Sequence, residues 1–566
     1  MDSAANFKVA YFSLEIALEN SLESYAGGLG ILAGDLLRSA TDLELPMVGV
    51  SLLNDQGYFK QEIDENGQQQ AEPVTDYDFS KLIKLPTEVS VRIGLEQVTI
   101  RAWQYLIKSS IKSSQFTIPV ILLDTNFSSN SDSNRQLTRR LYGGNEIERL
   151  KQKIILGRGG VKMLAALGYK NLEKYHLNEG HGALAAVELF LNSTQPDEKA
   201  KLASVRKKCV FTTHTPIREA INIYQSAEVL KYQADFPVKF HGLVEDGQVN
   251  MTKVALYFSG YSNAVSKSHQ IIAQEMFPEY HLQAITNGVH SATWTASEFQ
   301  KLYDKYLPGW RQAGQKLQQA TIIPIQELKV AHHNAKTRLL KYIYQTQKIS
   351  LADNIFTLGL ARRFTLYKRM NLLFSDLERL KAVQEKAGKL QIICAGKAHP
   401  QDESGQTMIK QIQAIKKQHA DWLTLVFLED YDLNQAQLIM AGVDALLNTP
   451  LPPLEASGTS GMKAAHNGVP QLSTLDGWWP EGYLAGRTGW AIGEGLSREA
   501  DPEIDAHDAL SLYQLLEKEV LPLYYQQPDK WLLMSREIIS RNASYFNAAR
   551  ALRQYWQEAY HFTGDL

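Results

Sequence analysis

The sequence predicts an α/β protein whose sheets are mostly parallel. Two observations lead to this fold class. Short apolar runs of strand length recur along the chain, and stretches with helical periodicity separate many of them. Polar or glycine-rich residues follow these runs directly, as at the turns of β-α-β units. Open sheets of this kind bind ligands outside the carboxyl ends of their strands, so residues just after each strand are the first candidates for a site.

The elements of the first half follow from this pattern. Strands are expected at Lys8–Ser13, Met47–Leu52, Ile118–Leu123, Tyr175–Asn178 and Cys209–Thr213. The stretch Gly182–Leu191 has a helical pattern. The segment Val89–Tyr105 partly alternates apolar and polar residues, with a turn at Gly94–Gln97, and therefore predicts an inserted hairpin.

The alternation is cleaner in the second half. Strands are expected at Phe356–Ala361, Leu390–Ala395, Thr424–Leu428, Ala445–Asn448 and Gln471–Thr474. Helical patterns cover Asn371–Ala387 and Asn434–Ala441, and the stretch from Asp505 to Tyr560 is mostly helical. At roughly 150 residues per domain, 566 residues would suggest about four domains. The pattern instead indicates two large α/β halves that meet near Ile285–Trp294.

Composition excludes several classes of function. The 59 basic and 61 acidic residues give a net charge of −2, which argues against a nucleic-acid partner. A hydrophobic fraction of 44% argues against disorder. The first residues, MDSAANFKVAYFSLE, resemble no signal peptide, and no apolar run reaches the length of a membrane span. The two cysteines, Cys209 and Cys394, indicate a reducing compartment, and we expect a cytoplasmic protein without membrane contact.

Two motifs in the second half carry chemistry. Arg362, Arg363, Lys368 and Arg369 follow an expected strand, where cations can bind phosphate. The small-residue loop of residues 455–461 (EASGTSG) opens onto an expected helix at 462–467, an arrangement that can form an anion nest. Lys463 would lie in the first turn of that helix. A cation there opposes the helix dipole, which favours a functional lysine, one able to form a Schiff base.

The motifs of the first half are less specific. Residues 25–35 form a glycine loop with a dinucleotide-like string, which fits equally well a close approach of backbone to a phosphate or a sugar. The spacing of residues 176–181 (HLNEGH) matches no zinc motif, so no metal site is predicted. His214 follows a strand and could donate a hydrogen bond to a ligand. Glu15 and Glu179 keep a glycoside hydrolase open as an alternative.

Taken together, these strings resemble the α-glucan (glycogen, starch or maltodextrin) phosphorylase family. The matching stretches include YFSLEIALENSLESYAGGLGILAGD, HLNEGHGALA, FTTHTP, ITNGVHSATW, ARRFTLYKR, AGKAHP, FLEDYD and EASGTSGMKAAHNG. They keep the family's order over about residues 8–480. The chain looks like the short branch of the family, without the long insertions and the regulatory extension of the animal enzymes.

The resemblance implies a fold, a reaction and a cofactor. The fold would be GT-B, two Rossmann-like domains facing across a cleft. We expect residues 1–285 to form the N-terminal domain, with the glycine loop and glucan-site residues. Residues 286–566 would form a domain that binds pyridoxal 5′-phosphate (PLP), its C-terminal helices packing back on the first. The reaction would be the reversible, retaining phosphorolysis of α-1,4-glucans from the non-reducing end to α-glucose 1-phosphate, with the 5′-phosphate of PLP transferring a proton. Family members are commonly homodimers.

The resemblance also implies roles for residues at matching positions. Lys463 would carry PLP in a Schiff base, and Arg363 and Lys368 would bind phosphate. The other positions expected to contact PLP are Arg362, Gly458, Thr459 and Trp294, and those expected to contact the glucan are Glu455, Ser457, Tyr367, His214, Asn287, Gly28 and Leu29. Two phosphates held close together would need such cations to offset their repulsion.

Two departures from the family pattern leave alternatives open. Leu451 and Pro452 stand where short-branch members usually carry arginines, and His466 stands where an apolar residue is expected. If those arginines hold phosphate, phosphate affinity or the reaction itself would be altered. A non-catalytic glucan-binding protein of the same fold is therefore one alternative to a phosphorylase. A nucleotide-sugar glucan synthase, which shares the glycine-rich loop, is the other.

Overall fold

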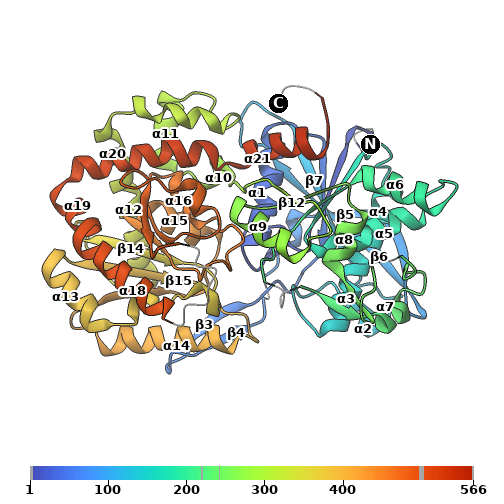
Figure 1. Cartoon of the computed structure of the whole chain (residues 1–566), viewed down its shortest axis with the longest axis horizontal. Helices are drawn as coiled ribbons and strands as arrows, with labels where there is room; N and C mark the ends of the chain where they lie inside the picture. The colour runs from blue at the N-terminus through green and yellow to red at the C-terminus, as the bar shows by residue number, and fades with distance from the viewer. Residues whose placement is uncertain (1–3, 75, 218–220, 241, 496–502, 564–566) are drawn as a thin grey trace. The chain divides into compact units, whose positions relative to one another are not determined.

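A computed structural model describes residues 4–74, 76–217, 221–240, 242–495 and 503–563. The chain divides into two compact units. Unit 1 comprises residues 1–59, 73–286 and 551–566, and unit 2 comprises residues 60–72 and 287–550. Each unit contains its own β-sheet and its own hydrophobic core (Figure 1). The α/β class predicted from the sequence is therefore confirmed for both units.

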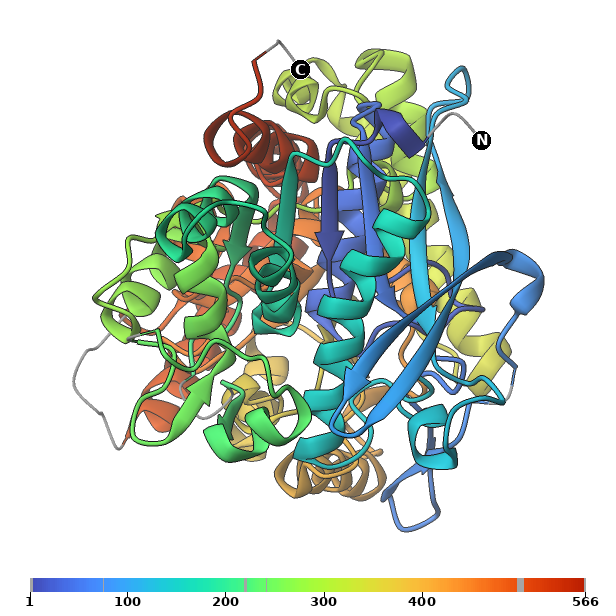
Figure 2. The ribbon, with the colours of Figure 1, turned by 90° about the vertical axis from the view of Figure 1, so that its right-hand side faces the viewer.

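Unit 1 is built on a nine-stranded sheet of order β13-β12-β9-β8-β1-β2-β7-β6-β5 within the described residues. Its strands are β1 (Val9–Phe12), β2 (Met47–Leu52), β5 (Ile83–Ile93), β6 (Glu96–Lys108), β7 (Thr117–Asp124), β8 (Lys174–Asn178), β9 (Cys209–Thr212), β12 (Tyr261–Ala264) and β13 (Gln283–Ala284). A separate ribbon pairs β10 (Ile223–Gln225) with β11 (Gln248–Asn250). Strand β6 runs antiparallel to both of its neighbours, β5 and β7, and the other neighbouring strands pair in parallel. Strands β5 and β6 form the predicted hairpin, which is longer than expected and lies at one edge of the sheet (Figure 2).

Helices complete unit 1. They are α1 (Gly28–Asp42), α2 (Asp132–Arg135), α3 (Glu146–Ile154), α4 (Gly160–Ala166), α5 (Ala183–Leu191), α6 (Glu198–Lys208), α7 (Ser226–Tyr232), α8 (Met251–Phe258) and α9 (Lys267–Met276). Helix α5 confirms the helix expected at Gly182–Leu191. The strands β12 and β13 are short and were not predicted, because two to four residues give too little periodicity.

Unit 2 contains an all-parallel sheet of order β16-β15-β14-β17-β18-β19 within the described residues. Its strands are β14 (Phe356–Ala361), β15 (Leu390–Ala395), β16 (Thr424–Leu428), β17 (Ala445–Asn448), β18 (Gln471–Thr474) and β19 (Gly489–Ile492). All but β19 were predicted with these bounds. The antiparallel pair β3 (Lys60–Ile63) and β4 (Gln69–Glu72) also belongs to this unit.

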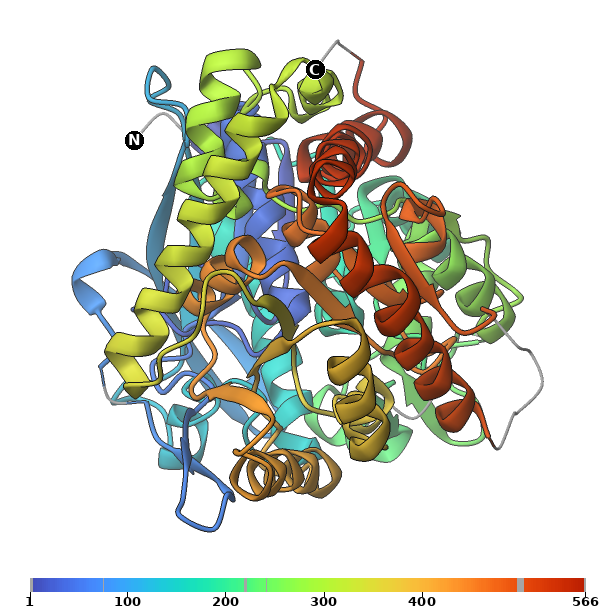
Figure 3. The same cartoon turned by 90° about the vertical axis from the view of Figure 1, so that its left-hand side faces the viewer.

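The helices of unit 2 include the 23-residue α12, which Figure 3 shows as the long yellow-green helix. The helices are α10 (Ser291–Trp294), α11 (Ser297–Tyr306), α12 (Ile325–Gln347), α13 (Leu377–Ala387), α14 (Glu403–Gln418), α15 (Leu433–Gly442), α16 (Ser460–Ala465), α17 (Trp479–Gly482), α18 (Ile504–Leu515), α19 (Leu521–Gln526) and α20 (Pro528–Ile538), and α21 (Ala548–Gln554) begins in unit 2 and ends in unit 1. The helix expected from Asn371 begins later, because Asp376 caps α13 by accepting a hydrogen bond from the backbone of Arg379.

Helix α1 packs closely against the chain that precedes it. A Cβ atom on Gly34 would lie 2.2 Å from the carbonyl oxygen of Ala17, whereas a Cβ on Gly28 would have no neighbour within 4 Å. We therefore expect Gly34→Ala to lower the free energy of unfolding by about 1–3 kcal/mol, because backbone must shift to admit the methyl group. Gly28→Ala in the same helix is the matched control and should leave the free energy of unfolding unchanged. Chemical denaturation measures both variants, and equal stabilities would contradict this packing.

Candidate functional site

Basic side chains meet a carboxylate at the carboxyl edge of the unit 2 sheet. Arg362 follows β14 directly, and Lys368 ends a short 3-10 helix six residues later. Glu455 lies in the loop after β17, which pairs in parallel with β14, so the two loops meet at the same edge. The Glu455 Oε2 atom accepts a hydrogen bond from Arg362 Nη2 at 2.6 Å and another from Lys368 Nζ. The structure thus brings together three residues that the sequence placed in two separate motifs.

Burial and charge control the ionisation of these groups. All three side chains are less than 10% exposed. Burial alone would raise the pKa of Glu455, but the charges of Lys368 and Arg362 outweigh it and lower that pKa well below its usual range. Burial and the neighbouring Arg362 lower the pKa of Lys368, against the opposite influence of Glu455. Glu455 is therefore ionised, and a further anion would favour the charged form of Lys368.

Arg362 has unused hydrogen-bonding capacity. Its Nε and Nη1 atoms are buried and have no hydrogen-bond partner among the described residues. Leaving buried donors of a charged group unpaired is costly, and proteins rarely do so without a reason. A guanidinium in this state fits an anionic ligand such as a phosphate group.

A buried lysine lies in the same unit. Lys463 is 7% exposed, and its Nζ atom lies 4.2 Å from the ring centroid of Trp294, which is itself buried. One argument made from the sequence is wrong. Helix α16 begins at Ser460 and has only six residues, so Lys463 lies in its last turn and does not oppose a dipole at its start. The burial of its ionisable amine still indicates that Lys463 has a functional role.

The loop that carries Glu455 has a defined geometry. Gly458 has a φ of 69°, a conformation that side chains rarely adopt. The hydroxyl of Ser457 donates to the carbonyl of Gly458 at 3.1 Å, and Thr459 is the residue before α16. The backbone N–H of Trp478 donates to the carbonyl of Ser457 at 2.9 Å. The predicted residues of this loop are therefore fixed by the turn that follows β18.

Asp476, in that turn, is a buried residue that the sequence analysis missed. Its Oδ2 atom accepts a hydrogen bond from the backbone N–H of Glu455 at 2.8 Å. Burial first, and the charge of Glu455 second, raise the pKa of Asp476 to about 7. The rule that ligand-binding residues follow strands could have found it, since it lies two residues after β18.

Arg369 holds the chain next to Leu451 and Pro452, the two positions that depart from the family pattern. This buried arginine donates to the carbonyl oxygens of Thr449 and Pro450 and to the carboxylates of Asp505 and Asp508. The backbone N–H of Leu451 donates to the carbonyl of Tyr367 at 2.7 Å. Arg369 therefore fixes the chain that leads to the altered positions 451–452, and its charge is already paired.

Three further residues that the sequence analysis singled out, Tyr367, Asn287 and His466, also lie in unit 2. Lys368 Nζ lies 4.5 Å from the ring centroid of Tyr367, and burial raises the pKa of Tyr367 well above its usual value. Asn287 is buried, and its carbonyl accepts a hydrogen bond from Arg550. His466 is buried but fully bonded, to the hydroxyl of Ser291 and the carbonyl of Met462. Burial lowers its pKa to about 4, so a neutral histidine replaces the expected apolar residue without an unpaired charge.

His214 lies at the carboxyl edge of the unit 1 sheet. Its backbone N–H donates to Glu179 Oε2, and its Nε2 atom lies 2.7 Å from Asn178 Oδ1. Burial lowers the pKa of His214 to about 3, so the ring is neutral. Because the amide oxygen can only accept, Nε2 carries the proton and Nδ1 is an acceptor. With Nε2 bonded to Asn178, the Nδ1 atom of His214 can accept a hydrogen bond from a ligand, and donation to a ligand would require Nε2 to leave Asn178.

The glycine loop of unit 1 is anchored by Glu15. Its Oε2 atom accepts hydrogen bonds from the backbone of Ala26 and Gly27, just before Gly28 and Leu29 open α1. Its other oxygen accepts from the hydroxyl of Tyr142 at 2.7 Å. Glu15 is thus a structural anchor, which gives no support to its use with Glu179 as a hydrolytic pair.

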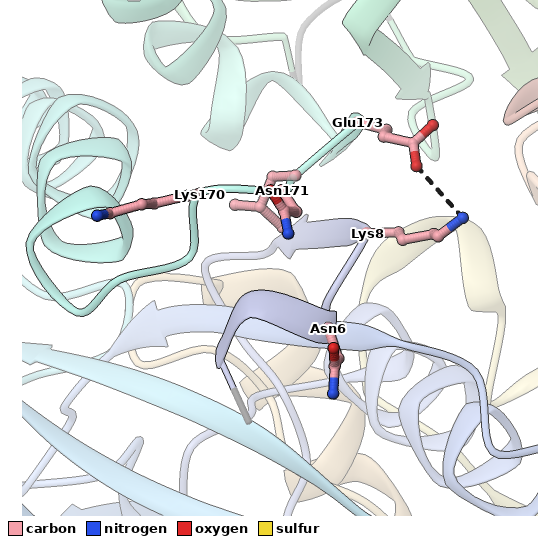
Figure 4. A pocket seen from close by; sticks show the side chains of 6 residues that line it. Asn6, Lys8, Lys170, Asn171 and Glu173 are labelled. Atoms are coloured by element: carbon pink, nitrogen blue, oxygen red, sulfur yellow. Dashed lines mark ion pairs between the residues drawn. The ribbon is translucent and has the colours of Figure 1, made fainter. Parts of the chain in front are cut away.

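A cavity of about 580 Å³ lies elsewhere in unit 1 (Figure 4). It is bordered by Lys8, which precedes β1, and by Glu173, which precedes β8, and these two form an ion pair at 3.3 Å. The cavity therefore lies at the amino edge of the sheet. None of the residues selected from the sequence lines it.

The described ranges contain neither a cluster of metal ligands nor a membrane-spanning helix. No group of three or more His, Cys, Asp or Glu side chains there is arranged to hold a metal ion. No helix in the described part of the chain has the length and apolar character needed to span a membrane. Cys209 and Cys394 are both buried free thiols, one in each unit.

Comparison with known proteins gives consistent results. A family model described as "Carbohydrate phosphorylase" matches residues 236–479. The chain is 37% identical to a maltodextrin phosphorylase of Thermococcus litoralis, over 98% of this chain and 70% of that protein. It is 36% identical to a glycogen phosphorylase of Aquifex aeolicus, over 98% of this chain and 86% of that protein. An uncharacterised protein of Methanocaldococcus jannaschii is 33% identical over 97% of this chain and 99% of its own length.

Proposed function

Because the chain belongs to the carbohydrate phosphorylase family, we propose that it is an α-glucan phosphorylase. Its substrates would be α-1,4-glucans and inorganic phosphate, and its product α-glucose 1-phosphate, in a reversible reaction at the non-reducing end. The single observation that carries the proposal is the buried Arg362, two of whose nitrogens have no partner among the described residues, beside Lys368 and Glu455. Buried cationic groups with unpaired donors suit the binding of an anion, such as phosphate, in a site shielded from water.

The same observations fit PLP as a cofactor. Lys463 is a buried amine beside a tryptophan, which suits covalent attachment of an aromatic aldehyde, and Arg362 offers donors for a phosphate group. When bound, PLP would supply a phosphate group that takes up and returns a proton next to the substrate phosphate. Lys463 would hold it, with Arg362, Gly458, Thr459 and Trp294 around it.

The chain's own residues would then bind and orient the substrates. Arg363 and Lys368 would neutralise phosphate, which weakens its repulsion of a second phosphate group. Glu455 and Ser457 would accept or donate hydrogen bonds to sugar hydroxyls, as would the other expected contacts Tyr367, Asn287, His214, Gly28 and Leu29. The glycosidic C1–O bond breaks, its oxygen receives a proton from phosphate, and a phosphate oxygen bonds C1 on the same face of the sugar.

The proposal includes a wider organisation. Two Rossmann-like domains would face across a cleft in the GT-B arrangement, split near residues 285–286. The protein would act as a homodimer in the cytoplasm, independently of membranes and nucleic acids. Light scattering on the purified protein tests the dimer.

An assay with a spectrum tests the function. Phosphate and maltodextrin should yield glucose 1-phosphate, and glucose 1-phosphate should in turn extend maltodextrin. The protein should also show the near-ultraviolet or visible absorbance of a bound pyridoxal. Glucan binding without turnover in either direction would select the non-catalytic alternative. Turnover with a nucleotide sugar, without bound pyridoxal, would select the glucan synthase.

A further inference from the structure

Asp476 lies next to Glu455 in the proposed phosphate site, and the proposed function gives it no role. It is 3% exposed and lies just past the carboxyl end of β18. Its two carboxyl oxygens accept from the backbone N–H groups of Glu455 and Gly477, each at 2.8 Å. The Gly477 contact closes a local turn, so the bond to Glu455 is the one that joins two loops.

The turn of Asp476 grips the Glu455 loop at further points. The N–H of Trp478 donates to the carbonyl of Ser457 at 2.9 Å. The backbone approaches so closely that a Cβ on Gly477 would lie 2.3 Å from that same carbonyl oxygen. Since the backbone of Glu455 is fixed from this side, its side chain is directed toward Lys368 and Arg362.

Charged groups face Asp476 from the elements packed around it. Glu455 opposes its ionisation, while Lys368 and the two N–H donors favour it. Asp476 in turn acts on Tyr367, together with Glu455, Arg362 and Arg363, so these groups form one electrostatic cluster. Burial and Glu455 outweigh the favourable contacts, and the pKa of Asp476 is raised to about 7.

We propose that Asp476 is a positioning residue of the phosphate site, which orients Glu455 and, when ionised, weakens the binding of an anion by Lys368. The inference rests on the proposed function, because it concerns the same site. Below pH 7 the carboxyl group is mostly neutral, and above it a negative charge is added beside the anion. Anion affinity should therefore fall as the pH rises through about 7. Reciprocally, a bound anion raises the pKa of Asp476.

The test measures sulfate binding to the holoenzyme by calorimetry between about pH 5.5 and 8.5. Sulfate is the probe because it stays a dianion over this range, whereas phosphate itself titrates. The wild type should lose about tenfold in affinity over the range, the factor that corresponds to a shift of one pKa unit in Asp476. Asp476→Asn, whose side chain does not titrate, should lose the part of this slope that Asp476 contributes and keep the part that Lys368 contributes, because burial lowers the pKa of Lys368 to about 7. Asp376→Asn, which alters the cap of α13, is the matched control and should keep the wild-type slope.

A second pair of variants tests the positioning role. Asn at position 476 keeps an oxygen that can accept from the Glu455 N–H, whereas Leu does not. Phosphorolysis by Asp476→Leu should therefore have a kcat/KM at least about tenfold below that of Asp476→Asn. The KM for phosphate, taken as the ratio of Asp476→Asn to wild type at each pH, gives a further readout in which phosphate titration cancels. Folding is checked by circular dichroism, and the Asn variant decides the question if the Leu variant does not fold.

The outcomes separate this inference from the proposed function. A wild-type slope retained in Asp476→Asn, in sulfate affinity and in the KM ratio, would overturn the role of Asp476 even if the enzyme is active. Sulfate binding with the expected slope but no phosphorolysis would refute the phosphorylase and leave the role of Asp476 standing. A wild-type profile without any slope would also overturn the inference.

Discussion

Replacing Lys463 by alanine is expected to abolish covalent attachment of PLP. A Schiff base needs a primary amine, and Lys463 is a buried lysine whose Nζ lies 4.2 Å from the ring centroid of Trp294. Borohydride reduction of the purified protein, followed by peptide mass spectrometry, should find the modified lysine in the wild type and none in the variant. Phosphorolysis should fall by about three orders of magnitude or more.

Two control variants distinguish the covalent bond between Lys463 and PLP from the effect of the positive charge. Lys463→Arg retains the positive charge but cannot form the bond, so it should behave as the alanine variant does. Lys368→Met removes the other buried lysine of the site and should keep the reducible adduct while binding phosphate weakly. A modified peptide recovered from Lys463→Ala, or its loss in Lys368→Met alone, would show that the wrong lysine was selected.

The parts of the site that could be predicted follow from one geometric rule. Arg362 and Glu455 lie in loops after β14 and β17, two strands that apolar runs predicted with their observed bounds. Parallel pairing of these strands then brings the loops together. Asp476 obeys the same rule after β18, but an Asp-Gly pair also suits an ordinary turn, and sequence alone does not show that its carboxyl is buried.

The parts that could not be predicted depend on contacts between distant segments. Residues 60–72 belong to unit 2, although the chain on both sides of them belongs to unit 1. Gln61 exchanges hydrogen bonds with Asp430, and Gln69 with Ala398, across more than 300 residues of sequence. No local periodicity encodes such pairings. The expected position of Lys463 in the first turn of a helix was wrong because α16 begins at Ser460, two residues earlier than predicted, and ends at Ala465.

The second large effect is expected at Arg362. Arg362→Met should lower kcat/KM for phosphorolysis by about 10²–10³-fold, the loss usual when one donor to a developing or bound anion is removed. The physical reason is that Nε and Nη1 are buried without partners among the described residues, so a bound phosphate would gain both donors at no cost of breaking existing bonds. Arg362→Lys keeps the charge and should recover part of the activity.

Binding of an anion should also protect the protein through this residue. A ligand at 100 times its Kd stabilises the native state by about 2.7 kcal/mol, so phosphate should raise the Tm of the wild-type protein freed of PLP, in which no cofactor phosphate occupies Arg362. Arg362→Met should lose this phosphate-dependent increase. Arg379→Met, which breaks a contact with Glu517 in the same unit, should keep it whatever its own Tm. If phosphate stabilises all three proteins equally, the anion binds elsewhere, and the unpaired nitrogens of Arg362 need a different explanation.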